Sequence, residues 1–412
     1  MKIVFLTISC IKDISNRGIY NDLMRKFRNE GHELCVVSPR PRFMQEDTNI
    51  VCDNGVSYLG VKTWNVTKSK SIIEKGIGQL LIEDQFIRAL KKYVDTSDID
   101  LVLYSTPPVT FSKVIGFLKR VSPKAKTYLL LKDIFPQNAV DIGMMSKNGL
   151  KSIIYKVFRN KERKLYALSD FIGCMSPANV EYLLKHNPEV SAERVEVAPN
   201  SVEPKNDFVE KGESLELKAK TERCFIRTKY NLPIDRPIFI YGGNLGKPQG
   251  IPFLIDCLDA NRSRDDCHFV IVGSGTERPK IESWFNTRNP KSVTLLNKLP
   301  KDEYDMLVRS CDVGLIFLDY RFTIPNYPSR LLSYMENRMP IVAATDYVSD
   351  IGKIAEENGY GYWCHSNSVS DFTTLIDRMV NSNRLEMGEK GYKFFTDHYL
   401  VDRTYSIIMS HL

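Results

Sequence analysis

Long apolar runs are absent from this chain of 412 residues, and none of its stretches reaches the roughly 18 apolar residues that cross a bilayer. The N-terminal apolar run is short and is followed at once by Cys10, Lys12 and Asp13. A secretory signal would need a longer apolar core. These absences predict a cytoplasmic protein with no spanning helix.

Paired cysteines and metal-binding spacings are missing as well. The chain has 9 Cys, with no Cys-x-x-Cys pair, and only 6 His. Asp98-Ile99-Asp100 has the letters of a metal-binding DxD pair, but it precedes an expected strand instead of following one. We therefore expect reduced thiols, no bound metal and no cofactor.

Charge is unevenly distributed. Residues 1–200 carry 30 Lys and Arg against 21 Asp and Glu, whereas the whole chain has 57 against 50. No nucleic-acid-binding motif accompanies this basic half. An anionic membrane surface is therefore the expected partner of the first half, and nucleic acid is not.

A basic amphipathic helix is expected at Lys151–Lys164, with Ile153, Ile154, Val157 and Phe158 on one face. Such a helix can lie in a membrane interface. The alternative is that its apolar face packs on the domain, and both can hold if the flanking cations face lipid.

Strand and helix patterns alternate along both halves, which predicts an α/β fold of doubly wound sheets. The length favours two domains. We expect an N-terminal domain at 1–203, a charged linker region at 204–236 and a C-terminal domain at 237–392. An amphipathic segment at about 393–412 is expected to pack back on the first domain.

Glycine-rich turns follow several expected strands. One runs from Tyr241 to Lys247, and another is Gly273-Ser274-Gly275. Turns of this kind let backbone N–H groups approach an anion. Because the carboxyl ends of parallel strands meet at one sheet edge, the turns predict a ligand crevice there.

These motifs and their order resemble family-4 glycosyltransferases, above all the WbuB-like enzymes of capsule and O-antigen synthesis. The likeness covers nearly the whole chain. The stretches that carry it are Tyr241–Gly250 (GNLG-x-x-QG), Val272–Arg278 (VG-x-G-x-ER), Pro328–Met335 with Met339–Ala343 (PSKL-x-x-YM and PVVA), Asp133–Gln137 and Pro199–Val202.

The resemblance implies the GT-B fold, which is two Rossmann-like domains facing a cleft, and retention at the anomeric carbon. It also implies a nucleotide-sugar donor on the C-terminal domain, with its diphosphate near the glycine turns and its base near Gly273 and Leu299. The donor-binding residues expected on this basis are Gly243, Asn244, Lys247, Gly273, Gly275, Leu299, Ser329, Arg330, Ser333 and Glu336.

The chain departs from the wider family where that family has two Glu and two cations. The Glu positions hold Pro325 and Ser333, and the cation positions hold Asn244 and Gln249. Arg330 and Lys247 are the available substitutes for the cations. Arg330 is the better match to a diphosphate because its guanidinium offers a planar fork of donors. Glu336 could take the ribose, or it could be an ordinary helical Glu.

Catalytic and acceptor-binding groups are expected in the N-terminal half. Asp133 follows a strand end and could accept the proton of an acceptor hydroxyl, or it could simply cap a turn. Arg17-Gly18 opens the first helix and could contact a phosphate. Arg330 is the second expected catalytic residue, since metal-independent transfer requires a fixed cation beside the leaving diphosphate.

The expected function is sugar transfer from a UDP-sugar, of N-acetylhexosamine type, to a polyprenyl-diphosphate-linked saccharide. The enzyme would be peripheral on the inner face of the cell membrane. Two alternatives stay open. One is a UDP-sugar 2-epimerase of the same fold, and the other is an inactive scaffold subunit, which the missing Glu residues motivate.

Overall fold

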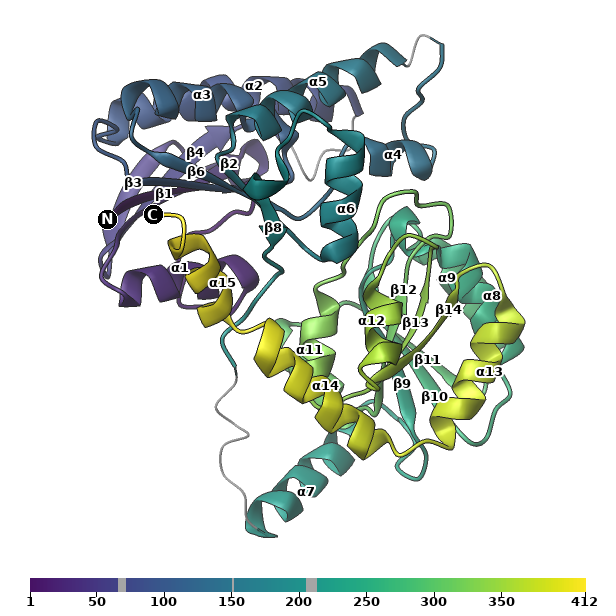
Figure 1. Cartoon of the computed structure of the whole chain (residues 1–412). Helices are drawn as coiled ribbons and strands as arrows, with labels where there is room; N and C mark the ends of the chain where they lie inside the picture. The colour runs from purple at the N-terminus through teal and green to yellow at the C-terminus, as the bar shows by residue number, and fades with distance from the viewer. Residues whose placement is uncertain (66–71, 150–151, 205–212) are drawn as a thin grey trace. The chain divides into compact units, whose positions relative to one another are not determined.

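The chain forms two α/β units in a computed structural model that describes residues 1–65, 72–149, 152–204 and 213–412. The first unit comprises Met1–Glu203 with Leu400–Leu412, and the second comprises Pro204–Tyr399. Each is built on one sheet with helices packed against it (Figure 1). The expected α/β class with doubly wound sheets is confirmed in both units.

The first unit has an eight-stranded sheet in the order β3-β4-β2-β1-β5-β6-β7-β8. All neighbours are parallel except β3 and β4, which form an antiparallel pair. The strands are β1 (Lys2–Leu6), β2 (Glu33–Pro41), β3 (Asn49–Asp53), β4 (Val56–Thr63), β5 (Leu101–Ser105), β6 (Lys126–Leu131), β7 (Phe171–Cys174) and β8 (Val195–Val197).

Helices cover both faces of this sheet, with α2, α3 and α5 along one face and α1 and α15 along the other (Figure 1). Central strands such as β5 are buried along their whole length, as near-continuous apolar runs of parallel sheets should be. The helices are α1 (Ile19–Asn29), α2 (Ile72–Tyr93), α3 (Ser112–Val121), α4 (Gln137–Asp141), α5 (Ser152–Leu168), α6 (Pro177–His186) and α15 (Val401–Met409), with short 3-10 turns η1 (Arg42–Met44), η2 (Val109–Phe111) and η3 (Ala192–Arg194).

The second unit has a six-stranded parallel sheet in the order β11-β10-β9-β12-β13-β14. Its strands are β9 (Ile238–Asn244), β10 (His268–Ser274), β11 (Val293–Leu296), β12 (Val313–Phe317), β13 (Ile341–Thr345) and β14 (Gly361–His365). Its helical elements are α7 (Glu213–Lys229), η5 (Lys247–Gln249), α8 (Ile251–Ala260), α9 (Arg278–Arg288), α10 (Lys301–Ser310), α11 (Arg330–Glu336), α12 (Ile351–Glu357), α13 (Val369–Val380) and α14 (Arg384–His398).

The expected linker at 204–236 contains a helix. Within it, residues 205–212 lie outside the described part, and α7 follows. The guanidinium of Arg227 is 2% exposed and donates to the carbonyl of Ser310 at 2.8 Å and to the carboxylate of Asp312 at 2.6 Å. Because these bonds fix α7 against α10, the helix is part of the second unit and not a connection between units.

The C-terminal segment also differs from expectation, because two helices replace the single one expected at about 393–412. The helix α14 belongs to the second unit, and only Leu400–Leu412 returns to the first. There Val202 and Leu400 form an isolated β-bridge. The rings of Tyr405 and Phe27 pack edge-on, with their centres 4.9 Å apart. Among the described helices, none has the length and apolarity needed to cross a membrane.

Candidate functional site

Three glycines let the turns after β9 and β10 touch one another. Gly243 (φ +126°) and Gly273 (φ +149°) face each other in the paired strands. A Cβ on Gly273 would lie 1.9 Å from the carbonyl oxygen of Gly243, and one on Gly275 would lie 2.3 Å from that of Leu245. These turns lie next to the switch point between β9 and β12, where open α/β sheets bind ligands.

The turn after β9 is shaped by two amide side chains. The Nδ2 of Asn244 donates to the Oε1 of Gln249 at 2.9 Å, and the backbone N–H of Gly246 donates to the same oxygen at 3.2 Å. Asn244 and Lys247 are exposed. Asn244 and Gln249, at the positions where the resemblance implies cations, therefore stabilise the turn by hydrogen bonds. Lys247 in the same turn contributes a positive charge.

Arg330 lies against this turn. Its Cζ is 4.3 Å from the centre of the Tyr241 ring, and a Cβ on Gly243 would lie 3.7 Å from the same atom. The Nη1 of Arg330 is buried and has no hydrogen-bond partner among the described residues. The guanidinium therefore brings donors and a positive charge to the exposed turn at Gly243.

The remaining residues expected at the start of α11 and within it differ in exposure. Ser329 is exposed and Ser333 is half-buried, but the side chain of Glu336 is only 2% exposed. The helix has 7 residues. Because a helix this short has only a small macrodipole, the guanidinium of Arg330 is the main positive group at the start of α11.

The turn expected to hold the base follows β11 and contains the half-buried Leu299. Sequence reasoning gave no role to Arg278, whose guanidinium connects this turn to the preceding one. It donates to the carbonyls of Gly273 and Leu296, the latter at 2.8 Å, and to the side chain of Asn297 at 2.9 Å. Its place in the VG-x-G-x-ER stretch was the signal that could have found it.

Asp133 lies directly beyond β6 in the first unit. Its backbone N–H donates to the Oγ1 of Thr106 at 3.3 Å, and the residue as a whole is half-buried, with its carboxyl group turned away from solvent. Burial raises the pKa of Asp133 to about 6 and lowers the pKa of the adjacent Lys132 to about 7. A carboxylate made more basic by burial is suited to accept a proton near neutral pH.

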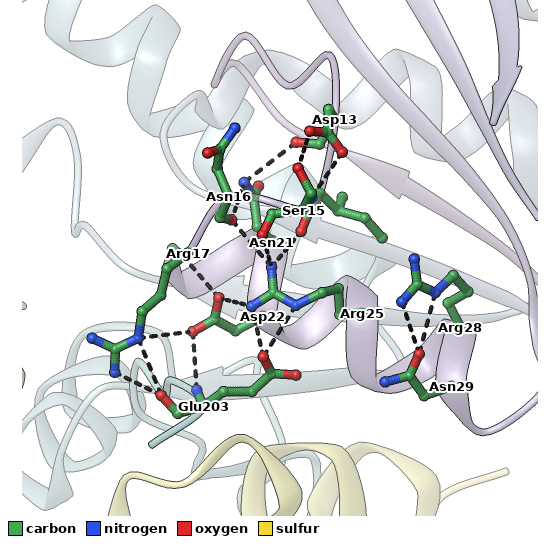
Figure 2. Close-up of polar contacts among 12 residues, drawn as sticks. Asp13, Ser15, Asn16, Arg17, Asn21, Asp22, Arg25, Arg28, Asn29 and Glu203 are labelled. Carbon is green, nitrogen blue, oxygen red and sulfur yellow. Dashed lines mark hydrogen bonds and ion pairs between the residues drawn. The ribbon is translucent and has the colours of Figure 1, made fainter. Parts of the chain in front are cut away.

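Arg17 and Gly18, expected at a phosphate, have partners within the first unit, and Figure 2 shows those of Arg17. Arg17 donates to the carbonyl of Glu203 at 2.6 Å, and the N–H of Gly18 donates to the carboxylate of Asp22 at 2.8 Å. Asp22 is fully buried. A carboxylate therefore occupies the start of α1, where an anionic acceptor group was expected, and these two residues contribute to the fold.

The expected donor residues Gly243, Asn244, Gly273, Gly275 and Arg330 come together at one edge of the second sheet. Within the described ranges, no group of three or more His, Cys, Asp or Glu is arranged to hold a metal ion. The chemistry offered by this edge is that of a fixed guanidinium and a glycine turn, both of which suit a phosphate group.

Comparison with known proteins identifies the class of enzyme. Residues 222–394, most of the second unit, match the family model described as "Glycosyl transferases group 1". The chain is a glycosyltransferase. It is 24% identical over 319 residues to the probable glycosyltransferase WbjE of Pseudomonas aeruginosa, which covers 77% of this chain and 74% of that protein. A putative colanic acid biosynthesis glycosyl transferase, WcaI of Escherichia coli (strain K12), is 24% identical over 132 residues, 32% of each chain.

The fold of this glycosyltransferase is GT-B. Anabaena HepE, solved in complex with UDP, superposes with a TM-score of 0.65 at 13% identity, covering 100% of this chain and 99% of that one. The expected GT-B glycosyltransferase is thus confirmed, whereas the WbuB-like subgroup stays a prediction.

Proposed function

We propose that this glycosyltransferase is a retaining, WbuB-like enzyme of capsule, O-antigen or exopolysaccharide synthesis. It transfers a sugar, of N-acetylhexosamine type, from UDP to a polyprenyl-diphosphate-linked saccharide. Similar proteins support this setting, since one is named for colanic acid biosynthesis and one structural neighbour was solved with UDP.

The observation that carries the donor assignment is the guanidinium of Arg330 beside Gly243. A leaving UDP develops negative charge on its diphosphate, and a preorganised cation lowers the barrier by stabilising that charge. The buried Nη1 of Arg330 has no hydrogen-bond partner among the described residues, and a phosphate oxygen would supply the missing acceptor. Lys247 adds a second, exposed cation at the same turn. We expect this transfer to be metal-independent.

Asp133 is proposed as the residue that takes the proton of the acceptor hydroxyl. Its pKa of about 6 keeps it ionised at neutral pH and more basic than an exposed Asp. The general base of a transfer reaction works best with a pKa near the operating pH.

A patch on α5 supports contact with the membrane surface. Ile153, Ile154 and Val157 are 60%, 53% and 43% exposed, whereas Phe158 turns inward against Phe135. The exposed Lys156 belongs to the same stretch. Apolar side chains flanked by cations favour an anionic interface, with about 1 kcal/mol for each cation. The enzyme would be peripheral on the cytoplasmic side.

The reaction is tested with a panel of UDP-sugars and a short lipid-diphosphate acceptor, with products identified by mass spectrometry. We expect one lipid-linked product that is heavier by one sugar residue. Incubation with UDP-GlcNAc alone tests the epimerase alternative, because a new UDP-sugar would appear without acceptor. Binding of UDP with no turnover across the panel would favour the scaffold alternative.

The donor site is tested with Arg330→Ala. Loss of the charged hydrogen bonds should weaken UDP binding by about 1.5–3 kcal/mol in calorimetry. The matched control is Arg288→Ala, which removes an exposed guanidinium on α9 that is paired with Asp259 of α8. Parental UDP affinity in the Arg330 variant would refute the assignment.

A further inference from the structure

Arg330 is held by a buried aromatic ring. Tyr241 lies on β9 with no exposed surface, and its ring centre is 4.3 Å from the Cζ of Arg330. The hydroxyl of Tyr241 donates to the carbonyl oxygen of Asn244 at 2.8 Å. One side chain therefore contacts the guanidinium through its face and the donor turn through its hydroxyl.

Two further tyrosines pack against the end of β9 and bring neutral groups close to the same guanidinium. A Cβ on Gly242 would lie 2.1 Å from the hydroxyl of Tyr304, so this phenol packs directly on the turn. The hydroxyl of Tyr334 donates to the carbonyl of Ile240 at 3.1 Å. Burial raises the pKa of Tyr304 to about 12, which keeps it uncharged at neutral pH.

Among the described residues, no carboxylate forms an ion pair with Arg330, although buried cations usually have one, and the titratable groups that act on its charge are tyrosines. Neutral rings hold the plane of the guanidinium without cancelling its charge. A cation over an aromatic face is attracted by the ring quadrupole, and this attraction is stronger away from water. The charge therefore remains available to a ligand at Gly243.

We propose that Tyr241 is a positioning residue of the donor site, which holds the guanidinium of Arg330 flat so that its free donors face the diphosphate. This inference rests on the proposed donor site. It also explains how one guanidinium can serve where Asn244 and Gln249 replace two expected cations, because a side chain that is already ordered loses less entropy on binding.

The test compares the affinities of UDP and uridine in calorimetry, since uridine contacts the base turn but has no phosphate. Tyr241→Leu removes the ring, and we expect the ratio of UDP to uridine affinity to fall about tenfold. Tyr241→Phe keeps the ring and should stay within about threefold of the parent. In the Arg330→Ala background, Tyr241→Leu should cause no further loss, since its effect passes through Arg330.

The second unit contains a matched control. The Cζ of Arg378, on α13, lies 4.1 Å from the centre of the ring of Tyr362, on β14. Tyr362→Leu removes an equivalent stack and should leave the affinity ratio unchanged.

Arg330→Lys covers the case in which Tyr241→Leu does not fold. This substitution leaves Tyr241 and the core intact and replaces the planar guanidinium with the point charge of an ammonium group. The ratio of UDP to uridine affinity should therefore again fall about tenfold. A parental ratio in Arg330→Lys, or in folded Tyr241→Leu, would overturn the positioning role. If Arg330→Ala weakens UDP binding but Tyr241→Leu and Arg330→Lys do not, the proposed donor site holds and only the positioning role of Tyr241 is wrong. If Arg330→Ala does not weaken UDP binding, the proposed donor site itself is wrong.

Discussion

The carboxylate of Asp22 accepts the backbone N–H of Glu203 at 2.9 Å, joining the first turn of α1 to the last residue of that part of the first unit (Figure 2). Arg25 completes the cluster, because its guanidinium donates to Asp22 at 2.5 Å and to the carboxylate of Glu203 at 2.7 Å. Arg17 binds the carbonyl of Glu203. The N–H and the side chain of Glu203 are thus fixed to α1, and its carbonyl is fixed to Arg17, just before that helix.

Replacing Asp22 with Asn should therefore destabilise the first unit. The neutral Asn side chain removes the fully buried charge that pairs with Arg25. Its NH₂ group would also face the backbone N–H of Gly18 or Glu203, which is itself a donor. Breaking one partner of a buried pair costs about 3–5 kcal/mol in the free energy of unfolding. Urea titration followed by circular dichroism measures this loss. The control is Asp47→Asn, since the pair of Asp47 with Lys62 is exposed and its loss should leave the midpoint unchanged.

Gly273→Ala should distort the donor turn. Its Cβ would meet the carbonyl of Gly243 at 1.9 Å, and its φ of +149° is strained for any L-residue with a side chain. We expect a loss of at least about 1 kcal/mol in stability and no measurable UDP binding. Gly116→Ala, on α3 and 4.0 Å from the nearest atom outside its helix, should bind UDP normally and gain roughly 0.5–1 kcal/mol. Normal UDP binding by the Gly273 variant would show that the turn is not needed.

The glycine turns could be predicted because the signal is local: each follows an apolar strand directly in the sequence. The pairing of Tyr241 with Arg330 could not, because the two lie on strands and helices far apart in the chain. Nor could the burial of Asp22, since an Asp in the first turn of a helix is usually exposed and its partner Glu203 is distant in sequence. The internal partners of Arg17 and Gly18 were hidden for the same reason, and the phosphate contact expected at these residues stays a prediction.

The linker expected at 204–236 shows a second limit. The stretch before Arg227 is rich in Glu and Lys, a composition that predicts a connection between domains. The same residues, with Leu and Ala, are strong helix formers. The contact that makes α7 part of the second unit is the buried Arg227, and a charged residue gives no sign of burial until its partner Asp312 is known.

Asp133→Asn should separate turnover from donor binding. Without the carboxylate, the rate should fall by about 10²–10⁴, the usual contribution of a general base, while UDP affinity stays parental. In the parent, the rate should rise with pH through about 6 and level off above it, because the base must be ionised. Asp98→Asn, at an exposed site in the same unit, is the control. Near-parental turnover would reassign Asp133 to the structure of its turn.

Stability should show the opposite dependence on pH. The folded pKa of Asp133 lies above its ordinary value of 3.8, so folding favours the protonated form. Its stabilising contribution is present below about pH 4 and is lost as pH rises through 6. Asp133→Asn should therefore be more stable than the parent above pH 6, while both should unfold at the same denaturant concentration well below pH 4.

The last prediction concerns the patch of Ile153, Ile154 and Val157 on α5. Two cations of the expected basic face, Arg159 and Lys161, are ion-paired with the buried Glu162 and Glu83, so their substitution would report on folding. The exposed residues give a cleaner test. Replacing Ile153, Ile154 and Val157 with Ser should abolish flotation with anionic vesicles, because the apolar contact is lost.

The cationic part of this contact is tested with Lys147→Glu and Lys156→Glu, both at exposed positions. Together the two substitutions should weaken binding to anionic vesicles roughly tenfold or more. The parent protein should dissociate from these vesicles as added salt screens the attraction between its cations and the lipid. Phe225→Ser with Ile234→Ser is the matched control, since both side chains are 66% exposed but lie in the second unit. If that control loses flotation while the α5 variants float like the parent, the membrane contact belongs to the second unit and the patch on α5 is not the anchor.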